Sequence, residues 1–197
     1  MPSKLSEAVL DQLFGDARSH SHWQDRGVDD DLLREVYRLT SLGPTSANCS
    51  PARFVFVRTP EGRERLAGHV FEMNKQKVRT APVTVIVGQD TRFFEEMGRL
   101  CPDKPQLAQM FAADAALAEV NAFRNATLQG AYLIMAARAL GLDTGPMSGF
   151  DNAAVDAAFF AGGRFKSNFL CCLGYGDPGY LRPRLPRLAF DEACRFA

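Results

Sequence analysis

The stretch AALAEVNAFRNATLQGAYLIMAARALG, residues 115–141, decides the fold because it has helical composition and almost no charge. Only Glu119, Arg124 and Arg138 are charged in it. A helix that is apolar nearly all round belongs at the centre of a core or at a subunit interface. The helical pattern begins near residue 105, so we expect one or two helices over 105–141, and we expect the rest of the chain to pack around them.

Outward from this centre, further helices are predicted at residues 4–14, 30–42, 61–77, 151–160 and 190–197. Strands are predicted at 53–59, 83–87 and 167–174, where β-branched and aromatic residues dominate. Residues 144–150 are expected to form a Gly/Pro loop, and the tail after residue 174 to be extended. Three strands among many helices, in no regular alternation, predict an α+β fold.

Length and composition narrow the function classes. A chain of 197 residues and 21.7 kDa predicts a single domain over 1–197. Lys+Arg and Asp+Glu are equal at 23 each, so no overall field draws the chain to nucleic acid or to anionic membrane. No apolar run reaches the about 20 residues that a membrane helix needs. Five cysteines without a C-x-x-C pair favour a reducing cytoplasm.

Two turn-rich segments are candidates for ligand contact. Residues 43–51, GPTSANCSP, offer small polar side chains and exposed backbone N–H groups to a planar ring. Residues 145–150, GPMSGF, allow a close backbone approach because glycines flank the rigid Pro146. The structural alternatives are an ordinary polar loop for the first segment and a plain connector for the second.

Two basic segments offer donors for a phosphate group. The tail carries Arg182, Arg184 and Arg187, with Arg164 and Lys166 upstream, and the segment 18–23 reads RSHSHW. The alternative for the tail is a solvated surface. His20 and His22 suggest a metal weakly, since no carboxylate or cysteine stands at ligand spacing, so we expect no metal site.

Other catalytic patterns are not favoured. Cys171 and Cys172 lie in an apolar strand, where buried thiols are inert by default. A Cys/His hydrolase would require Cys49 or Cys101 beside one of three histidines, and nothing in the spacing favours it. No dinucleotide-binding glycine motif or P-loop follows a strand.

Taken in order, these segments resemble the nitroreductase family of FMN-dependent oxidoreductases. The matching motifs are Arg18-Ser19, the loop from Pro44 to Pro51, Asn74-x-x-Lys77, the stretch from Gly141 to Phe150, and the basic arm RPRLP at 182–186. Longer sequence segments, including RALGLDTGPMSGFD at 138–151, resemble those of a subgroup of the family that includes a malonic semialdehyde reductase.

The resemblance implies an α+β, nitroreductase-like fold with a central, mostly antiparallel sheet flanked by helices, in an intertwined homodimer. It implies one FMN in each of two clefts built from both subunits, with the long helix at the interface. Arg18, Ser19 and Arg184 would meet the phosphate, with His20 or His22 assisting because Ala17 and Ser21 replace the family's basic residues. The remaining cofactor-binding residues would be Thr45, Ser46, Asn48, Asn74, Lys77, Pro146, Met147, Ser148 and Gly149.

The activity implied is ping-pong hydride transfer from NADH or NADPH through flavin N5 to a small carbonyl, nitro or quinone substrate. The flavin would carry the chemistry, so no catalytic side chain is expected. For malonic semialdehyde, the substrate carboxylate would need a cation, and Arg53, Arg79 and Arg124 are equal candidates. The alternatives are a broad nitroarene or quinone reductase and a non-catalytic flavin-binding protein.

Overall fold

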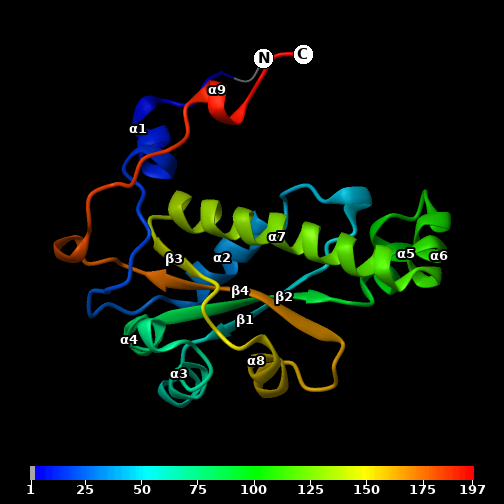
Figure 1. Cartoon of the computed structure of the whole chain (residues 1–197), viewed down its shortest axis with the longest axis horizontal. Helices are drawn as coiled ribbons and strands as arrows, with labels where there is room; N and C mark the ends of the chain where they lie inside the picture. Colours follow the sequence, from blue (N-terminus) through cyan, green and yellow to red (C-terminus); the bar gives the residue numbers. More distant parts are fainter. Residues whose placement is uncertain (1–2) are drawn as a thin grey trace.

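The computed structural model describes residues 3–197 and is built around a four-stranded antiparallel sheet (Figure 1). The strands are β1 (Ala52–Val57), β2 (Val83–Asp90), β3 (Asp143–Met147) and β4 (Phe165–Gly174). They lie in the order β1-β2-β4-β3, so β1 and β3 form the two edges. Every residue of β2 is buried, as expected for a central strand with a continuous apolar run. The prediction of an α+β fold with an antiparallel sheet is confirmed.

Strand β3 corrects the prediction that residues 144–150 are a loop. It pairs with β4 from Asp143 opposite Gly174 to Met147 opposite Leu170. The segment contains a proline and a glycine, which sequence patterns assign to turns. Pro146 is tolerated here because β3 is an edge strand, where one side of the backbone needs no partner strand. The sheet therefore has four strands, one more than predicted.

One face of the sheet is covered by α7 (Ala115–Ala139) and α2 (Asp30–Thr40), as Figure 1 shows. The core between them includes the buried side chains of Val36, Leu133, Val85 and Leu173. Small residues on the sheet-facing side of α7 allow its close approach, and the space beside Gly130 holds the Phe169 ring. The long apolar segment is thus the central helix, as expected.

The opposite face carries α3 (Pro60–Ala67), α4 (Glu72–Thr80) and α8 (Asn152–Phe159). A second core cluster lies beneath them. The prediction of one helix over 61–77 is wrong, because the chain breaks between α3 and α4. There Val70 forms a bridge with Phe150, and the Phe71 N–H donates to the Gly149 carbonyl at 2.9 Å. Tertiary pairing with the segment after β3 overrides local helix propensity at this point.

At one end of α7, a third cluster joins η3 (Phe93–Glu96), α5 (Met97–Leu100) and α6 (Pro105–Ala113). The helical stretch from 105 is therefore two helices. The break is at Asp114, whose side chain caps α7 by accepting from the Leu117 N–H at 2.9 Å.

The first and last helices lie away from the sheet (Figure 1). The N-terminal segment contains α1 (Glu7–Leu10) and the π-helical turn η1 (Asp11–Gly15), and the tail contains α9 (Phe190–Ala193). Two further short turns are η2 (Ser46–Asn48) and η4 (Pro178–Tyr180). Residues 182–197 are exposed. In the described part of the chain, no helix has the length and apolar character to cross a membrane.

Candidate functional site

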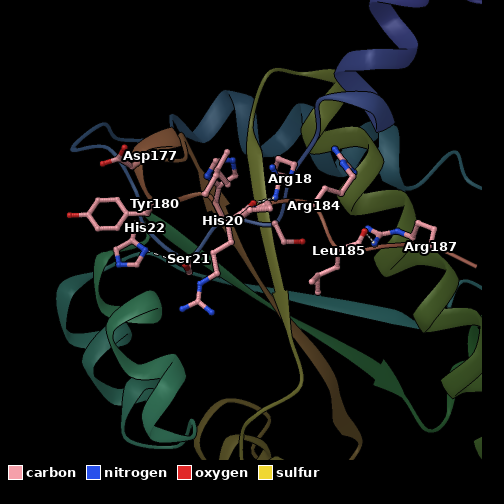
Figure 2. Close-up of a pocket in the computed structure, with 13 residues that line it drawn as sticks. Arg18, His20, Ser21, His22, Asp177, Tyr180, Arg184, Leu185 and Arg187 are labelled. Atoms are coloured by element: carbon pink, nitrogen blue, oxygen red, sulfur yellow. Dashed lines mark hydrogen bonds between the residues drawn. The ribbon is translucent and has the colours of Figure 1, made fainter.

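A cavity of about 570 Å³ lies between the N-terminal segment 18–22 and the tail segment 177–187 (Figure 2). The tail runs antiparallel to the N-terminal segment. The Asp177 N–H donates to the His22 carbonyl at 3.0 Å, and the Arg18 side chain donates to the Arg182 carbonyl at 2.5 Å. The structure therefore brings together the two basic segments that the sequence marked separately.

Guanidinium groups dominate this cavity. Arg18, Arg182, Arg184 and Arg187 line it, and Asp177 is the one carboxylate among its lining residues. The Arg184 side chain also donates to the carbonyls of Gly15 and Ala17, at 2.5 and 3.1 Å, and thereby fixes the tail against the N-terminal segment. Such a concentration of permanent cations and donors suits a phosphate group.

His20 lines the same cavity but is mostly buried. Its Nε2 lies 3.3 Å from Asp143 Oδ1, and its backbone N–H donates to the Thr144 carbonyl at 2.9 Å. Ser19 forms a parallel bridge with Thr144. The segment that carries the phosphate motif is therefore attached to the edge strand β3.

The β3 edge holds a second group of predicted residues. Lys77 Nζ donates to the Pro146 carbonyl at 3.4 Å, and Asn74 Nδ2 donates to the Gly149 carbonyl at 2.9 Å. Gly145 leaves the room that this contact needs, since a Cβ there would lie 2.6 Å from Lys77 Cε. Met147 and Ser148 follow in the same segment, so α4 and β3 together present a cation, an amide and a close-packed backbone.

Partial burial lowers the pKa of Lys77, although the nearby thiols of Cys172 and Cys171 act in the opposite direction. A desolvated ammonium group interacts strongly with any negative charge that is placed beside it.

The third group is the loop 43–51, which is held against α7. The Ser46 N–H donates to Asn125 Oδ1 at 2.8 Å, the Ser50 N–H donates to Thr45 Oγ1 at 3.2 Å, and Asn48 Nδ2 donates to the Leu100 carbonyl at 2.8 Å. These contacts position all three predicted residues of the loop.

The same loop has an unusual backbone. Ala47, Asn48 and Ser50 have φ values of 49°, 51° and 38°, which place three non-glycine residues in the left-handed region. Such residues cost free energy, and they concentrate at functional sites. The strained loop is therefore a candidate for ligand contact.

The structure does not bring the loop 43–51 and the β3 segment together within one chain. The loop leads into β1 at one edge of the sheet, whereas residues 143–147 form the other edge. Three inter-strand spacings of about 4.8 Å separate these edges by roughly 14 Å. Figure 1 shows the two segments at different ends of the molecule.

The three candidate cations for a substrate carboxylate have different surroundings. Arg53 donates to the buried Asp90 at 2.7 Å, and Arg79 donates through two nitrogens to Glu64, at 2.8 and 2.6 Å. Arg124 forms no ion pair within the described residues. It lines an apolar groove of about 670 Å³ along the outer side of α7.

Sequence reasoning missed several residues of the site. Asn121 and Asn125 anchor the loop 43–51, since Asn121 Oδ1 accepts from Cys49 Sγ at 3.5 Å. The sequence did contain a sign of their role, since these two amide side chains stand four positions apart in an otherwise apolar helix. Tyr180 gave no such signal, because its place beside His22 depends on the path of the tail.

The Cys49 thiol gives no support to a Cys/His hydrolase. Burial raises the pKa of Cys49 to about 11, so its nucleophilic thiolate is scarce at neutral pH. Burial also raises the pKa of Cys172 to about 11. Among residues 3–197, no cluster of three or more metal-ligating side chains occurs.

The chain matches the model of the nitroreductase family over residues 16–175. It is 60% identical over 190 residues to the Ralstonia pickettii protein named "Putative NADH dehydrogenase/NAD(P)H nitroreductase HadB", with 95% of this chain and 97% of the relative covered.

Among solved structures, the Bacillus subtilis protein ydfN has a TM-score of 0.86 at 22% identity, with 98% of this chain and 100% of ydfN covered. An Exiguobacterium sibiricum protein, crystallised in complex with FMN, has a TM-score of 0.83 at 20% identity, with 100% and 99% covered. At these identities the likeness establishes the fold.

Proposed function

The chain belongs to the nitroreductase family, and we propose that it is a homodimeric, FMN-dependent NAD(P)H oxidoreductase. The observation that carries the proposal is the joining of the two basic segments into one arginine-lined cavity that is attached to β3. The described residues fit FMN at both of its ends, as the donor chemistry of the two regions indicates.

At the phosphate end, Arg18, Ser19 and Arg184 would hold the monoester, with His20 fixed behind them by Asp143. The cavity offers permanent cations and a single carboxylate, which matches the charge of a phosphate. The hydrogen bonds from the Arg184 side chain to Gly15 and Ala17 keep the two segments together around the group.

At the ring end, Asn74, Lys77 and the backbone of 146–149 would hold the isoalloxazine. When bound, FMN supplies hydride chemistry between NAD(P)H and a second substrate. The half-buried Lys77 ammonium would stabilise negative charge on the pyrimidine side of the ring, because low local dielectric strengthens that attraction.

Two copies of the chain would complete each site. Thr45, Ser46 and Asn48 lie at the sheet edge opposite to Lys77, so a planar ligand that touches both groups needs a second copy. The outer side of α7 exposes four large apolar side chains that such a copy would cover: Leu117, Val120, Phe123 and Leu128. A single domain over 1–197 is part of the same proposal.

For the second substrate we propose a small carbonyl compound, of which malonic semialdehyde is the first to test. Arg124 is then the candidate for the carboxylate, since Arg53 and Arg79 are already paired. A broad nitroarene or quinone reductase is the second candidate, and the name of the 60% identical relative favours it. A reducing cytoplasm remains the proposed location, because all five cysteines are free thiols.

Purified protein tests this proposal directly. We expect a yellow dimer that bleaches with NADPH or NADH and recovers its colour when the second substrate is added. Turnover of malonic semialdehyde, a nitroarene and a quinone at equal concentrations then separates the two substrate classes. If the protein is yellow but neither nucleotide reduces its flavin, it is a non-catalytic flavin-binding protein. If the protein is purified colourless and does not bind added FMN, the proposal is contradicted.

A further inference from the structure

A row of polar side chains on α7 lies against the loop 43–51 and the start of β1. Its members follow the helical spacing of three or four residues, and we call them the α7 ladder: Asn121, Asn125, Gln129 and Tyr132. Asn125 and Gln129 are buried, with 1% and 5% of their surfaces exposed. A buried amide requires hydrogen-bond partners, because an unpaired polar group in a core costs free energy.

The two buried amides hold the chain on either side of its strained part. Asn125 Oδ1 accepts from the Ser46 N–H at 2.8 Å, and Gln129 Oε1 accepts from the Ala52 N–H at 2.9 Å. All three residues with left-handed backbone stand between these two anchored positions. Such conformations persist where the surroundings over-determine them. The two amides supply part of that restraint from a rigid helix.

The outer members of the ladder add two further contacts. The Tyr132 hydroxyl donates to the Pro44 carbonyl at 2.9 Å, and Gly43 leaves room for the tyrosine ring, since a Cβ there would lie 2.1 Å from Cδ2. Asn121 Oδ1 accepts from Cys49 Sγ at 3.5 Å. One helix thus bonds the facing chain at residues 44, 46, 49 and 52.

The Asn125 amide has one favourable orientation in this network. Its Nδ2 donates to the Asn121 carbonyl at 2.9 Å and to Asn121 Oδ1 at 3.0 Å, while its Oδ1 accepts from the Ser46 N–H. A flip of the amide would turn Nδ2 toward the Ser46 N–H, so that two donors would face each other. Asn125 is therefore the residue through which the ladder fixes the direction of the Ser46 N–H.

We propose that Asn125 is a positioning residue of the FMN site, which it serves by holding the Ser46 backbone in the conformation that the flavin meets. The inference rests on the proposed function, which assigns the loop 43–51 to FMN. A loop that is already in its bound conformation loses less conformational entropy when the ligand binds, so the affinity is higher. In the proposed dimer, each Asn125 would act on the cleft to which its own loop contributes.

The first test removes the amide with Asn125→Leu, at similar side-chain size. In apoprotein, we expect the backbone amides of the loop 43–51 to exchange about tenfold to a hundredfold faster than in wild type, read by hydrogen–deuterium exchange with mass spectrometry. FMN titrations followed by flavin fluorescence should show a dissociation constant raised about tenfold to a hundredfold, which is the effect of one buried donor left unpaired.

Asn125→Asp tests the hydrogen bonds themselves. A protonated carboxyl can accept from the Ser46 N–H and donate to Asn121, as the amide does, whereas the ionised form offers acceptors only. Burial raises the pKa of such a carboxyl, and Cys49, the titratable group bonded to Asn121, stays protonated because burial raises its pKa to about 11. Relative to wild type at the same pH, FMN affinity should be nearly restored at about pH 5.5 and reduced about tenfold at about pH 8.

Leu66→Ala is the control for a general loss of stability. Leu66 is fully buried in the core beneath α3, on the sheet face opposite to α7. Its truncation should lower the melting temperature. It should nevertheless leave the FMN dissociation constant and the exchange of the loop within about twofold of wild type, because distant sites act independently.

The outcomes separate this inference from the proposed function. If wild type binds FMN and Asn125→Leu binds it equally well, the inference is overturned and the proposed function stands. It is also overturned if Leu66→Ala loses FMN to the same extent as Asn125→Leu. Weak FMN binding by Asn125→Asp at both pH values would overturn it too, and this result can be read even if Asn125→Leu does not fold. A wild-type protein that binds no FMN would overturn both.

Discussion

Substituting Gly145 by alanine tests whether the β3 edge and the N-terminal basic segment 18–23 form one unit. The added Cβ would lie 2.4 Å from the His20 carbonyl oxygen and 2.6 Å from Lys77 Cε. The lysine side chain can swing away. The His20 carbonyl cannot retreat by the required distance of about 1 Å without stretching the 2.9 Å hydrogen bond from the His20 N–H to the Thr144 carbonyl.

We expect this overpacking to cost about 1–3 kcal/mol. For a chain of this size each kcal/mol shifts the melting temperature by about 2–4 °C, so Gly145→Ala should melt about 2–12 °C below wild type. It should also retain less FMN, because the shift of His20 moves Arg18 and Ser19 with it. The assay is differential scanning fluorimetry of apoprotein together with absorbance at 450 nm of the purified protein.

Gly27→Ala is the matched control, because a Cβ there meets nothing within 4 Å. It should stay within about 0.5 kcal/mol of wild type, as surface substitutions do. If Gly145→Ala has the same melting temperature as wild type and binds FMN fully, the coupling between these segments is refuted.

Three further outcomes are expected. Asp90 is fully buried and is paired with two arginines and a backbone N–H. Asp90→Asn should therefore lower the free energy of unfolding by about 2–4 kcal/mol at pH 7. This cost is smaller than that of breaking a fully buried ion pair, because the two arginines are partly exposed. Burial raises the pKa of Asp90, but these hydrogen bonds and charges lower it overall, so urea titrations should show this difference shrinking below about pH 4. Phe123→Glu should convert the proposed dimer to monomer in analytical ultracentrifugation, with native far-UV dichroism; a variant that stays dimeric would exclude α7 from the interface. Brief alkylation at pH 8, read by mass spectrometry, should label exposed Cys194 and spare Cys49, whose pKa is about 11; equal labelling would contradict its burial.

The sequence was informative where local pattern and tertiary environment agree. The apolar run of β2 was predicted because that strand is buried along its whole length, and α7 was predicted because its residues are helix-forming and almost uncharged. Strand β3 was not predictable from its residues, since GPM becomes a strand only through its pairing with β4. The break before α4 had the same cause, because Val70 bridges to Phe150, far away in the chain.

The same distinction holds for the candidate site: local motifs marked some of its residues, and tertiary structure alone decides the rest. The order of the motifs marked the N-terminal basic segment, the basic tail and the β3 backbone, and the structure brings these together. It could not indicate that Asn125 holds Ser46, or that the loop 43–51 lies at the opposite sheet edge, because such distances depend on strand order and not on spacing along the chain.

In the proposed dimer, the separation of the loop 43–51 from the Lys77 side of the site has a genetic consequence. A chain with a lesion in the loop 43–51 still supplies an intact Lys77 side, and a chain with a lesion at Lys77 still supplies an intact loop. When two such chains pair, one cleft inherits both defects and the other inherits neither. Two inactive alleles expressed in the same cell should therefore complement each other, up to half of the normal activity in each mixed pair.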